Sequence, residues 1–295
     1  MSSNQQKIRV AVLFGGKSGE HEVSLASARS VMGALDKTKY DIVPVGIDRT
    51  GRWITNGDPM ALLSAGGAQS AALPAGGQGQ QGETALTPTQ GRELVPGASH
   101  GRFPIVDVVF PVLHGTYGED GTIQGLLELA DLAYVGADVL GSAVGLDKEI
   151  QKAVLQAKGL PIVPCESVLR SRWQREPETV MAEIEARFAY PVFIKPANAG
   201  SSVGVSKAHD RQELARGLEL AARFDRKLLV EMAVDAREIE CSVLGNDDPI
   251  ASVPGEVIPC HEFYDYAAKY IEEDSELQIP ARLTPEQTRQ VQELA

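Results

Sequence analysis

The sequence is poor in positive charge, and this shortage excludes two classes of partner. Its 295 residues hold 28 Lys and Arg against 40 Asp and Glu, which gives a formal net charge of −12 at pH 7. A chain with this balance has no basic surface for a nucleic-acid backbone or an anionic membrane. We therefore expect no nucleic acid and no membrane as partner. Any phosphate that the protein binds must be met by a few placed lysines.

Long apolar runs and cysteine motifs are missing as well. The N-terminal apolar run, Val10 to Phe14, is far shorter than the roughly 20 residues of a membrane span. The three cysteines, Cys165, Cys241 and Cys260, are odd in number and show no metal-ligand spacing. Unpaired cysteines are typical of a reducing compartment, so we expect a cytoplasmic protein.

Strand-like and helix-like segments alternate along the chain, and this pattern predicts an α/β protein. In the first part, strands are expected over Ile8 to Phe14, Tyr40 to Ile47 and Ile105 to Leu113. The third of these is apolar on both faces, as a covered parallel strand should be. Helices are expected over Glu20 to Leu35 and Thr122 to Leu132, where apolar residues recur at helical spacing.

The same alternation continues to the end of the chain. Helices are predicted over Asp147 to Lys158, Glu178 to Phe188 and Arg211 to Phe224, and strands over Ile162 to Leu169, Val192 to Lys195, Val203 to Lys207, Leu228 to Val234, Ile239 to Leu244 and Ile250 to Ile258. Thr284 and Pro285 open a last helix with a capping box. We expect three domains, residues 1–135, 136–234 and 235–295, the last of them incomplete because the chain stops inside that helix.

Between Ser64 and Arg102 the composition changes sharply. The stretch holds nine glycines, three prolines and only four charged residues, and it has no Phe, Trp or Tyr. Such a segment cannot bury enough apolar surface to offset the entropy lost on ordering. We interpret it as a flexible insertion.

Two clusters of small and polar residues follow predicted strands of the first part. Gly15 to Glu20 opens a helix, so its amides can hold an anion, or it is an ordinary glycine turn. Glu20 itself either caps the helix or binds an ammonium group. His114 to Gly121 lies where a parallel strand ends, the place at which open α/β sheets bind ligands. The alternative is that Asp120 caps the next helix and His114 belongs to the core.

Three further segments carry candidate chemistry. Lys195 precedes a loop of small residues ending at Gly204, which with Lys148 can cover phosphates or is a plain hairpin. Glu231 and Glu238 can accept from an amine or from ribose hydroxyls, or they belong to a solvated acidic stretch. The aromatic segment from His261 to Tyr270 is either a loop or a lid over an active site.

Taken together and in this order, these motifs resemble the D-alanine–D-alanine ligase family of the ATP-grasp superfamily. The resemblance is carried by Gly15 to Ser24, His114 to Gly121, Gln124-Gly125, Tyr134 to Gly136, Asp147-Lys148, Lys195-Pro196, Gly200 to Gly204, Glu231 and Phe263 to Tyr270. Leu146 departs from the family, which usually has Met there. The resemblance implies an ATP-grasp fold of three lobes with an N-terminal domain built on an open parallel sheet.

The resemblance also implies roles for individual residues. Glu20 would hold the amino group of the first D-alanine, with His114 beside it. ATP would be bound by Lys148, Lys195, Ser201, Ser202, Glu231, Glu238 and Lys269, of which Glu231 would accept from the adenine amine and Glu238 would hold the ribose. Ser201 and Tyr270 would form a hydrogen-bonded triad with Glu20. The tyrosine at position 270 favours D-alanine as the second substrate.

The implied reaction is the ATP-dependent ligation of two D-alanines through an acyl phosphate, for peptidoglycan precursors. ATP and Mg²⁺ are the implied cofactors and a homodimer the implied assembly. The family's metal ligands are expected beyond residue 295, so we expect the 295-residue chain alone to be inactive or impaired. The alternatives are a D-alanine–D-lactate or D-alanine–D-serine ligase, and a non-catalytic module that binds a nucleotide or an amino acid.

Overall fold

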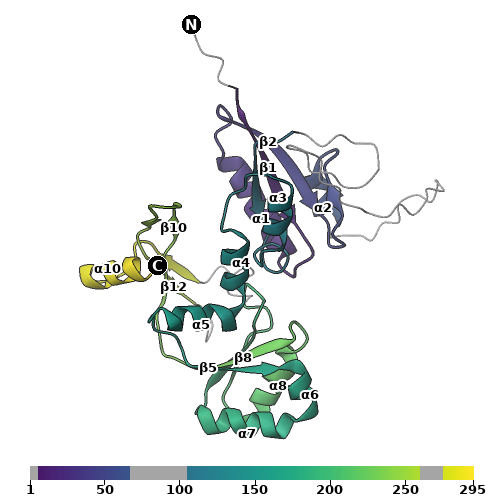
Figure 1. Cartoon of the computed structure of the whole chain (residues 1–295). Coiled ribbons are helices and arrows are strands. Elements are labelled where there is room, and N and C mark those ends of the chain that lie inside the picture. The colour runs from purple at the N-terminus through teal and green to yellow at the C-terminus, as the bar shows by residue number, and fades with distance from the viewer. Residues whose placement is uncertain (1–5, 67–104, 260–274) are drawn as a thin grey trace, which may run out of the picture. The chain divides into compact units, whose positions relative to one another are not determined.

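A computed structural model describes residues 6–66, 105–259 and 275–295. The chain divides into two compact units, Met1–Asp147 and Lys148–Ala295 (Figure 1). The three-domain division stays a prediction. Most of the expected insertion lies outside the described residues. So do Cys260 and the whole aromatic segment 261–270, which includes Lys269 and Tyr270. Within the described residues, none of the helices is long and apolar enough to cross a membrane.

The first unit is built on a four-stranded sheet. Its strands are β1 (Ile8–Gly15), β2 (Tyr40–Ile47), β3 (Trp53–Ile54) and β4 (Val108–Val112), in the order β3-β2-β1-β4. β1 pairs in parallel with both β2 and β4, which confirms the predicted parallel sheet, and β3 is an antiparallel edge strand. The carboxyl ends of β1, β2 and β4 therefore lie at the same edge of the sheet.

Alternation along β1 divides the core of this unit between the two faces of the sheet. Ala11 and Leu13 face a cluster that includes Leu127 of α3 (Thr122–Leu129). Val12 and Phe14 face a second cluster that includes Leu25 of α1 (His21–Ala34). The fully buried Phe14 alone contributes about 1.5–3 kcal/mol. Both clusters hold β1 in the centre and fix where its carboxyl end lies.

Two helices of this unit were not predicted from the sequence. α2 (Pro59–Gly66) includes Ser64, so the expected insertion does not begin there, and α4 (Val139–Leu146) follows a loop after α3. Asp138 caps α4 by accepting from the amide of Gly141 at 2.6 Å. The strand expected over Ile105 to Leu113 is shorter than predicted, because pairing with β1 covers only β4.

The second unit contains an antiparallel sheet in the order β5-β8-β6-β7. Its strands are β5 (Cys165–Leu169), β6 (Val192–Pro196), β7 (Ser206–Ala208) and β8 (Lys227–Met232). Two smaller sheets hold β9 (Glu238–Glu240), β10 (Val243–Leu244), β11 (Ile250–Ala251), β12 (Gly255–Ile258) and β13 (Glu276–Gln278). The single strand predicted over Ile239 to Leu244 is therefore two strands in different sheets.

The helices of this unit are α5 (Lys148–Ala157), α6 (Arg170–Arg175), α7 (Pro177–Arg187), α8 (Arg211–Ala221) and α10 (Pro285–Leu294). The predicted capping box at Thr284 is confirmed, with Gln287 as its partner. α6 was not predicted.

Alternation along β8 assigns its side chains to two different environments. Leu228 and Val230 belong to the core that α7 and α8 build on one face. Leu229 and Glu231 must then point to the other face, because successive side chains alternate. Figure 1 shows α5 over that second face, opposite α7 and α8. A carboxylate in the middle of this sheet is thus placed beneath α5.

Candidate functional site

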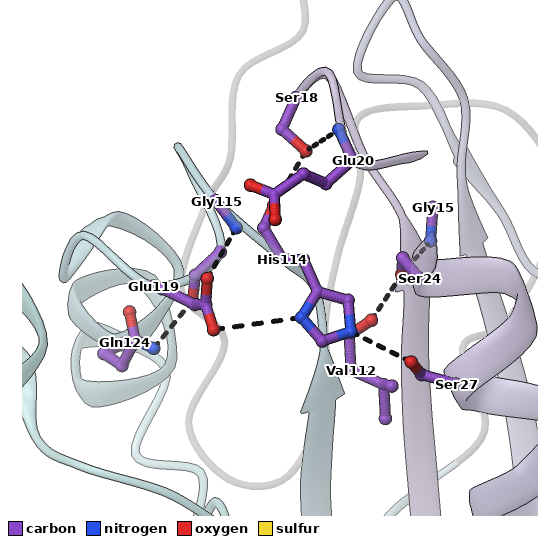
Figure 2. Close-up of polar contacts among 11 residues, drawn as sticks. Gly15, Ser18, Glu20, Ser24, Ser27, Val112, His114, Gly115, Glu119 and Gln124 are labelled. Carbon is purple, nitrogen blue, oxygen red and sulfur yellow. Dashed lines mark hydrogen bonds and ion pairs between the residues drawn. The ribbon is translucent and has the colours of Figure 1, made fainter. Parts of the chain in front are cut away.

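In the first unit, a network of serine hydroxyls joins the glycine turn after β1 to the end of β4 (Figure 2). Ser18 donates to the carbonyl of His114 at 2.7 Å and accepts from the amide of Glu20 at 3.2 Å. Ser24 accepts from the amide of Gly15 at 2.8 Å and donates to the carbonyl of Val112. These bonds bring together the two clusters that the sequence predicted, although they lie about a hundred residues apart.

Glu20 lies inside this network and is only 4% exposed. It occupies the N-cap position of α1, a helix that the structure describes in full, but its side chain makes no capping hydrogen bond there. Glu20 is therefore the N-cap residue by position, as one interpretation predicted, but its side chain is not the capping acceptor. Its Oε2 lies 2.1 Å from the point where a Cβ on Gly115 would be, and Gly115 has φ +68°. Glycine at 115 is required both by the backbone conformation and by the close approach of the carboxylate.

His114 is half-buried beside Glu20 and is held by two neighbours (Figure 2). Its Nε2 lies 3.0 Å from Ser27 Oγ on α1, and its Nδ1 lies 3.8 Å from Glu119 Oε1. The other oxygen of Glu119 accepts from the amide of Gly115 at 2.6 Å. The interpretation of His114 as a core histidine is wrong, because its side chain is 30% exposed. Ser27 and Glu119 were not selected from the sequence as site residues.

The contacts between His114 and Glu119 shift the pKa values of the two side chains in opposite directions. Interaction with the Glu119 carboxylate raises the pKa of His114 above its ordinary value; partial burial opposes the rise, and Glu20 adds a smaller upward contribution. Burial acts to raise the pKa of Glu119, but the interaction with the His114 ring and the hydrogen bond from the amide of Gly115 outweigh it and lower that pKa. Each member of the pair therefore favours the charged form of the other.

Asp120 closes the turn before α3, as the second interpretation of this cluster proposed. Its carboxylate accepts from the amide of Thr122 at 3.0 Å and from that of Tyr117 at 2.8 Å. The assigned N-cap of α3 is nevertheless Gly121. Asp120 is a structural residue, whereas Glu119 is turned toward His114.

Beside His114 lies a cavity of about 630 Å³. Ser27, Glu119 and Gln124 line it together with small residues of α4. Gln124 donates to the carbonyl of Gly118 at 2.9 Å, while its buried Oε1 has no hydrogen-bond partner among the described residues. We call Ser18, Glu20, His114, Gly115 and Glu119 the strand-end cluster. His114 and Glu119 of this cluster line the cavity, so an imidazole and a carboxylate face space for a small polar molecule.

In the second unit, Lys148 fixes the loop of small residues that follows β6. Its Nζ donates to the carbonyl of Ala199 at 2.5 Å, and its amide donates to the carbonyl of Ala197 at 3.1 Å. Ser201 and Ser202 are both left-handed, with φ +47° and φ +56°. Together with the hydrogen bond from the amide of Val203 to the carbonyl of Gly200 at 3.0 Å, these two residues form a tight turn. β6 and β7 pair antiparallel around this loop, so the expected loop between two strands is confirmed. The alternative of a plain hairpin with an exposed lysine is wrong, because the side chain of Lys195 is 21% exposed and pairs with Glu231.

Lys195 and Glu231 meet on the sheet face beneath α5. Lys195 Nζ donates to Glu231 Oε2 at 2.6 Å, and Lys152 Nζ lies 3.2 Å from Oε1. Glu231 is 6% exposed, so its interpretation as part of a solvated acidic stretch is wrong. Cys165 pairs with it across the sheet, and burial raises the pKa of the Cys165 thiol. Lys152 was missed in the sequence, although its spacing of four from Lys148 places both lysines on one face of a helix.

The remaining predicted residues are not brought together by the described structure. Glu238 is exposed on β9, in a different sheet from Glu231. Lys269 and Tyr270 lie outside the described residues, so the triad of Glu20, Ser201 and Tyr270 stays a prediction.

The two clusters differ in what they can hold. The lysines of the second unit are groups that can pair with the phosphates of a nucleotide. Across residues 6–66, 105–259 and 275–295, by contrast, no group of three or more His, Cys, Asp and Glu is arranged to hold a metal ion. The described residues therefore offer lysines and serine hydroxyls beside one loop, but no group of this kind for a metal ion.

Comparison with known proteins agrees with this geometry. A family model described as the D-Ala–D-Ala ligase N-terminus matches residues 9–137, and one described as the C-terminus matches residues 154–295. The D-alanine–D-alanine ligase of Heliobacterium modesticaldum is 49% identical over 98% of this chain and 77% of its own length. That of Natranaerobius thermophilus is 45% identical over 95% of this chain and 74% of its own length.

Solved structures give the same answer. The VanG D-Ala:D-Ser ligase from Enterococcus faecalis superimposes with a TM-score of 0.77 at 36% identity, covering 98% of this chain and 81% of that one. The D-alanine–D-alanine ligase from Coxiella burnetii gives 0.76 at 33% identity, covering 98% and 75%. The fold is thus α/β of the ATP-grasp class. The chain belongs to the D-alanine–D-alanine ligase family.

Proposed function

We propose that the protein joins two D-alanine molecules at the expense of ATP, to supply a dipeptide for peptidoglycan synthesis. The observation that carries the proposal is the meeting of Glu20 and His114 at the end of a parallel sheet, in a chain of this family. Relatives of 45–49% identity bear the name D-alanine–D-alanine ligase. D-alanine and ATP are the proposed substrates.

The first D-alanine is a zwitterion, and the strand-end cluster offers a partner for each of its charges. Its ammonium group pairs with the buried carboxylate of Glu20. Its carboxylate lies toward the imidazolium of His114, whose raised pKa favours the charged form. Because hydrogen bonds that involve ions are the stronger ones, this pairing fixes which way round the molecule binds.

In the proposed nucleotide site, Lys148, Lys195, Ser201 and Ser202 bind the phosphates. Glu231 accepts from the exocyclic amine of adenine, and Glu238 holds the ribose. Lys269 approaches the γ-phosphate, and Tyr270 completes the triad with Ser201 and Glu20. Mg²⁺, when bound, neutralises charge on the phosphates. The lysines of this chain add fixed positive charge at the same place.

The reaction follows from the weakness of a carboxylate as an electrophile. A carboxylate oxygen of the first D-alanine attacks the γ-phosphorus of ATP, so that an acyl phosphate forms and ADP leaves. The neutral amine of the second D-alanine then attacks the acyl carbon and loses a proton, and inorganic phosphate leaves with the C–O bonding pair. Water must be excluded while the acyl phosphate exists. We assign that task to the segment 261–270.

The proposal extends to the cellular setting. We propose a cytoplasmic homodimer, because cell-wall precursors of this kind are made where ATP is available. The competing substrates to be distinguished are D-serine and D-lactate, since a structural relative is titled a D-Ala:D-Ser ligase.

The test is phosphate release from ATP and Mg²⁺ by the protein produced from its complete reading frame. We expect release to require D-alanine and to yield the dipeptide by mass spectrometry. Adding D-serine or D-lactate in equal concentration should leave the dipeptide as the main product. A main product that carries D-serine or D-lactate would overturn the choice of second substrate. Release that does not depend on D-alanine would overturn the ligase reaction itself.

A further inference from the structure

The ion-paired group beneath α5 contains a lysine that the proposed function does not use. Lys152 Nζ lies 3.2 Å from Glu231 Oε1, and it also donates to the carbonyl of Val163 at 3.2 Å. The side chain of Lys152 is 16% exposed and that of Glu231 is 8% exposed. A long cationic side chain is rarely buried to this extent unless it is paired, so this lysine has a specific position to hold.

The two oxygens of Glu231 are divided between two lysines with different surroundings. Lys195 on β6 approaches Oε2, whereas Lys152 on α5 approaches Oε1. Oε1 is buried and has no hydrogen bond in the described part of the chain, so Lys152 attracts it through charge rather than through an aligned hydrogen bond. Lys152 is also anchored to a backbone carbonyl, and among the described residues it and Lys195 are the cations paired with Glu231.

The fixed position of Lys152 matters because the proposed function gives Lys195 a nucleotide phosphate as a partner in addition to Glu231. When the ammonium group of Lys195 turns to a nucleotide phosphate, Oε2 of Glu231 is released as an acceptor. A buried carboxylate that loses its remaining cation is strongly destabilised, and it then moves or takes up a proton. A protonated carboxyl group would donate as well as accept, and it would no longer select for an amine.

We propose that Lys152 is a positioning residue for Glu231, and that through Glu231 it determines the preference for a 6-amino purine over a 6-oxo purine. The inference rests on the proposed function, in which Glu231 accepts from the adenine amine. An anionic acceptor held in place attracts the amine of adenine and repels the carbonyl oxygen of hypoxanthine. Without Lys152, this distinction should weaken.

α5 connects this role to phosphate binding. Lys148 and Lys152 are one helical turn apart on α5, where Lys148 holds the loop of small residues. Glu149 on the same helix pairs with Lys227 of β8 at 2.6 Å. α5 therefore contacts both the strand that carries Glu231 and the proposed phosphate loop. In the proposed function, the same helix thus positions the groups that bind the adenine and those that bind the phosphates.

The experiment measures binding of ADP and of IDP, its 6-oxo analogue, by calorimetry with the full chain. We expect the wild-type protein to prefer ADP. Lys152→Gln should lower ADP affinity about tenfold or more, because a charge-assisted contact is lost, with little change for IDP. Lys152→Arg should keep most of the preference. Lys158→Gln is the matched control, since Lys158 is exposed beyond the end of the same helix.

Each alternative outcome identifies what fails. A variant Lys152→Gln that loses ADP and IDP equally, or that keeps the full preference, would overturn the inference. In a Glu231→Gln background, Lys152→Gln should change the preference no further, whereas an additive effect would show that Lys152 does not act through Glu231. Lys152→Met, which keeps the aliphatic stem, replaces Lys152→Gln if thermal unfolding shows that the latter is not folded. A wild-type protein without any preference for ADP would instead contradict the proposed role of Glu231.

Discussion

The strand-end cluster of the first unit and the lysine group beneath α5 of the second unit both contain a buried glutamate, but they stabilise it differently. The amide of Glu20 donates to the Ser18 hydroxyl, and its carboxylate lies beside Gly115, which leaves it room because it has no side chain. Glu231 sits between the ammonium groups of two long side chains. The first carboxylate lies against the backbone, whereas the second group can rearrange at Lys195, the lysine that the proposed function assigns to a phosphate. The difference suits a small rigid substrate in one place and a nucleotide that displaces a lysine in the other.

The sharpest way to break this comparison is to remove the charge of each glutamate in turn. We expect Glu20→Gln to weaken D-alanine binding by about 3–5 kcal/mol, the usual effect of deleting one member of a buried ion pair, while ADP binding is retained. Glu231→Gln should do the reverse. Calorimetric titration of each variant with D-alanine and with ADP measures both. Glu22→Gln, an exposed neighbour on α1, is the control.

If either variant lost affinity for D-alanine and for ADP to the same degree, the two clusters would not be separate recognition sites. If that variant were Glu20→Gln, Glu20 would have a structural role only. Retention of full D-alanine affinity by Glu20→Gln would contradict the ammonium contact directly.

A second test concerns the rigidity of the strand-end cluster. Gly115→Ala forces a side chain into a left-handed backbone, which costs about 1–3 kcal/mol, and its Cβ would collide with Glu20. We expect a lower urea midpoint and a raised KM for D-alanine. Gly125→Ala is the matched control. Among the residues that the structure describes, a Cβ at this helical position meets nothing within 4 Å, so that variant should gain about 0.5–1 kcal/mol. Equal urea midpoints for the two variants would show that the strand-end cluster can move to accommodate a side chain at position 115, and would contradict its rigidity.

The sequence predicted the local part of both clusters and missed the part that depends on the fold. β2 has the bounds predicted for it and β1 differs by one residue, because long apolar strands are recognisable without their neighbours. Lys152 was missed because its importance arises only when α5 covers β8. The burial of Glu231 was missed for a related reason, since it depends on β8 lying inside the sheet with Glu231 on the face under α5. The helix α2 was missed because its Ala and Gly residues resemble those of the segment that follows.

The smallest expected effect is a change in the pKa of His114 when Glu119 loses its charge. Because Glu119 is the main cause of the raised pKa of His114, Glu119→Gln should lower that pKa toward its ordinary value of 6.5. NMR titration of the His114 ring measures the change directly. Glu213→Gln, which removes the partner of His209 on α8, is the control and should leave the His114 titration unchanged.

The same pair gives a sign for the dependence of stability on pH. The contribution of His114 is fully present below 6.5 and is lost as the pH rises through its raised pKa. That of Glu119 is present above 4.5 and is lost as the pH falls through its lowered pKa. The difference in stability between wild type and Glu119→Gln should therefore be largest between these limits. It should shrink as the pH rises through the raised pKa of His114, and it should vanish as the pH falls through the lowered pKa of Glu119. A difference that persisted unchanged at high pH would mean that Glu119 acts through the amide of Gly115 alone, and the strand-end cluster would then be held entirely by its backbone.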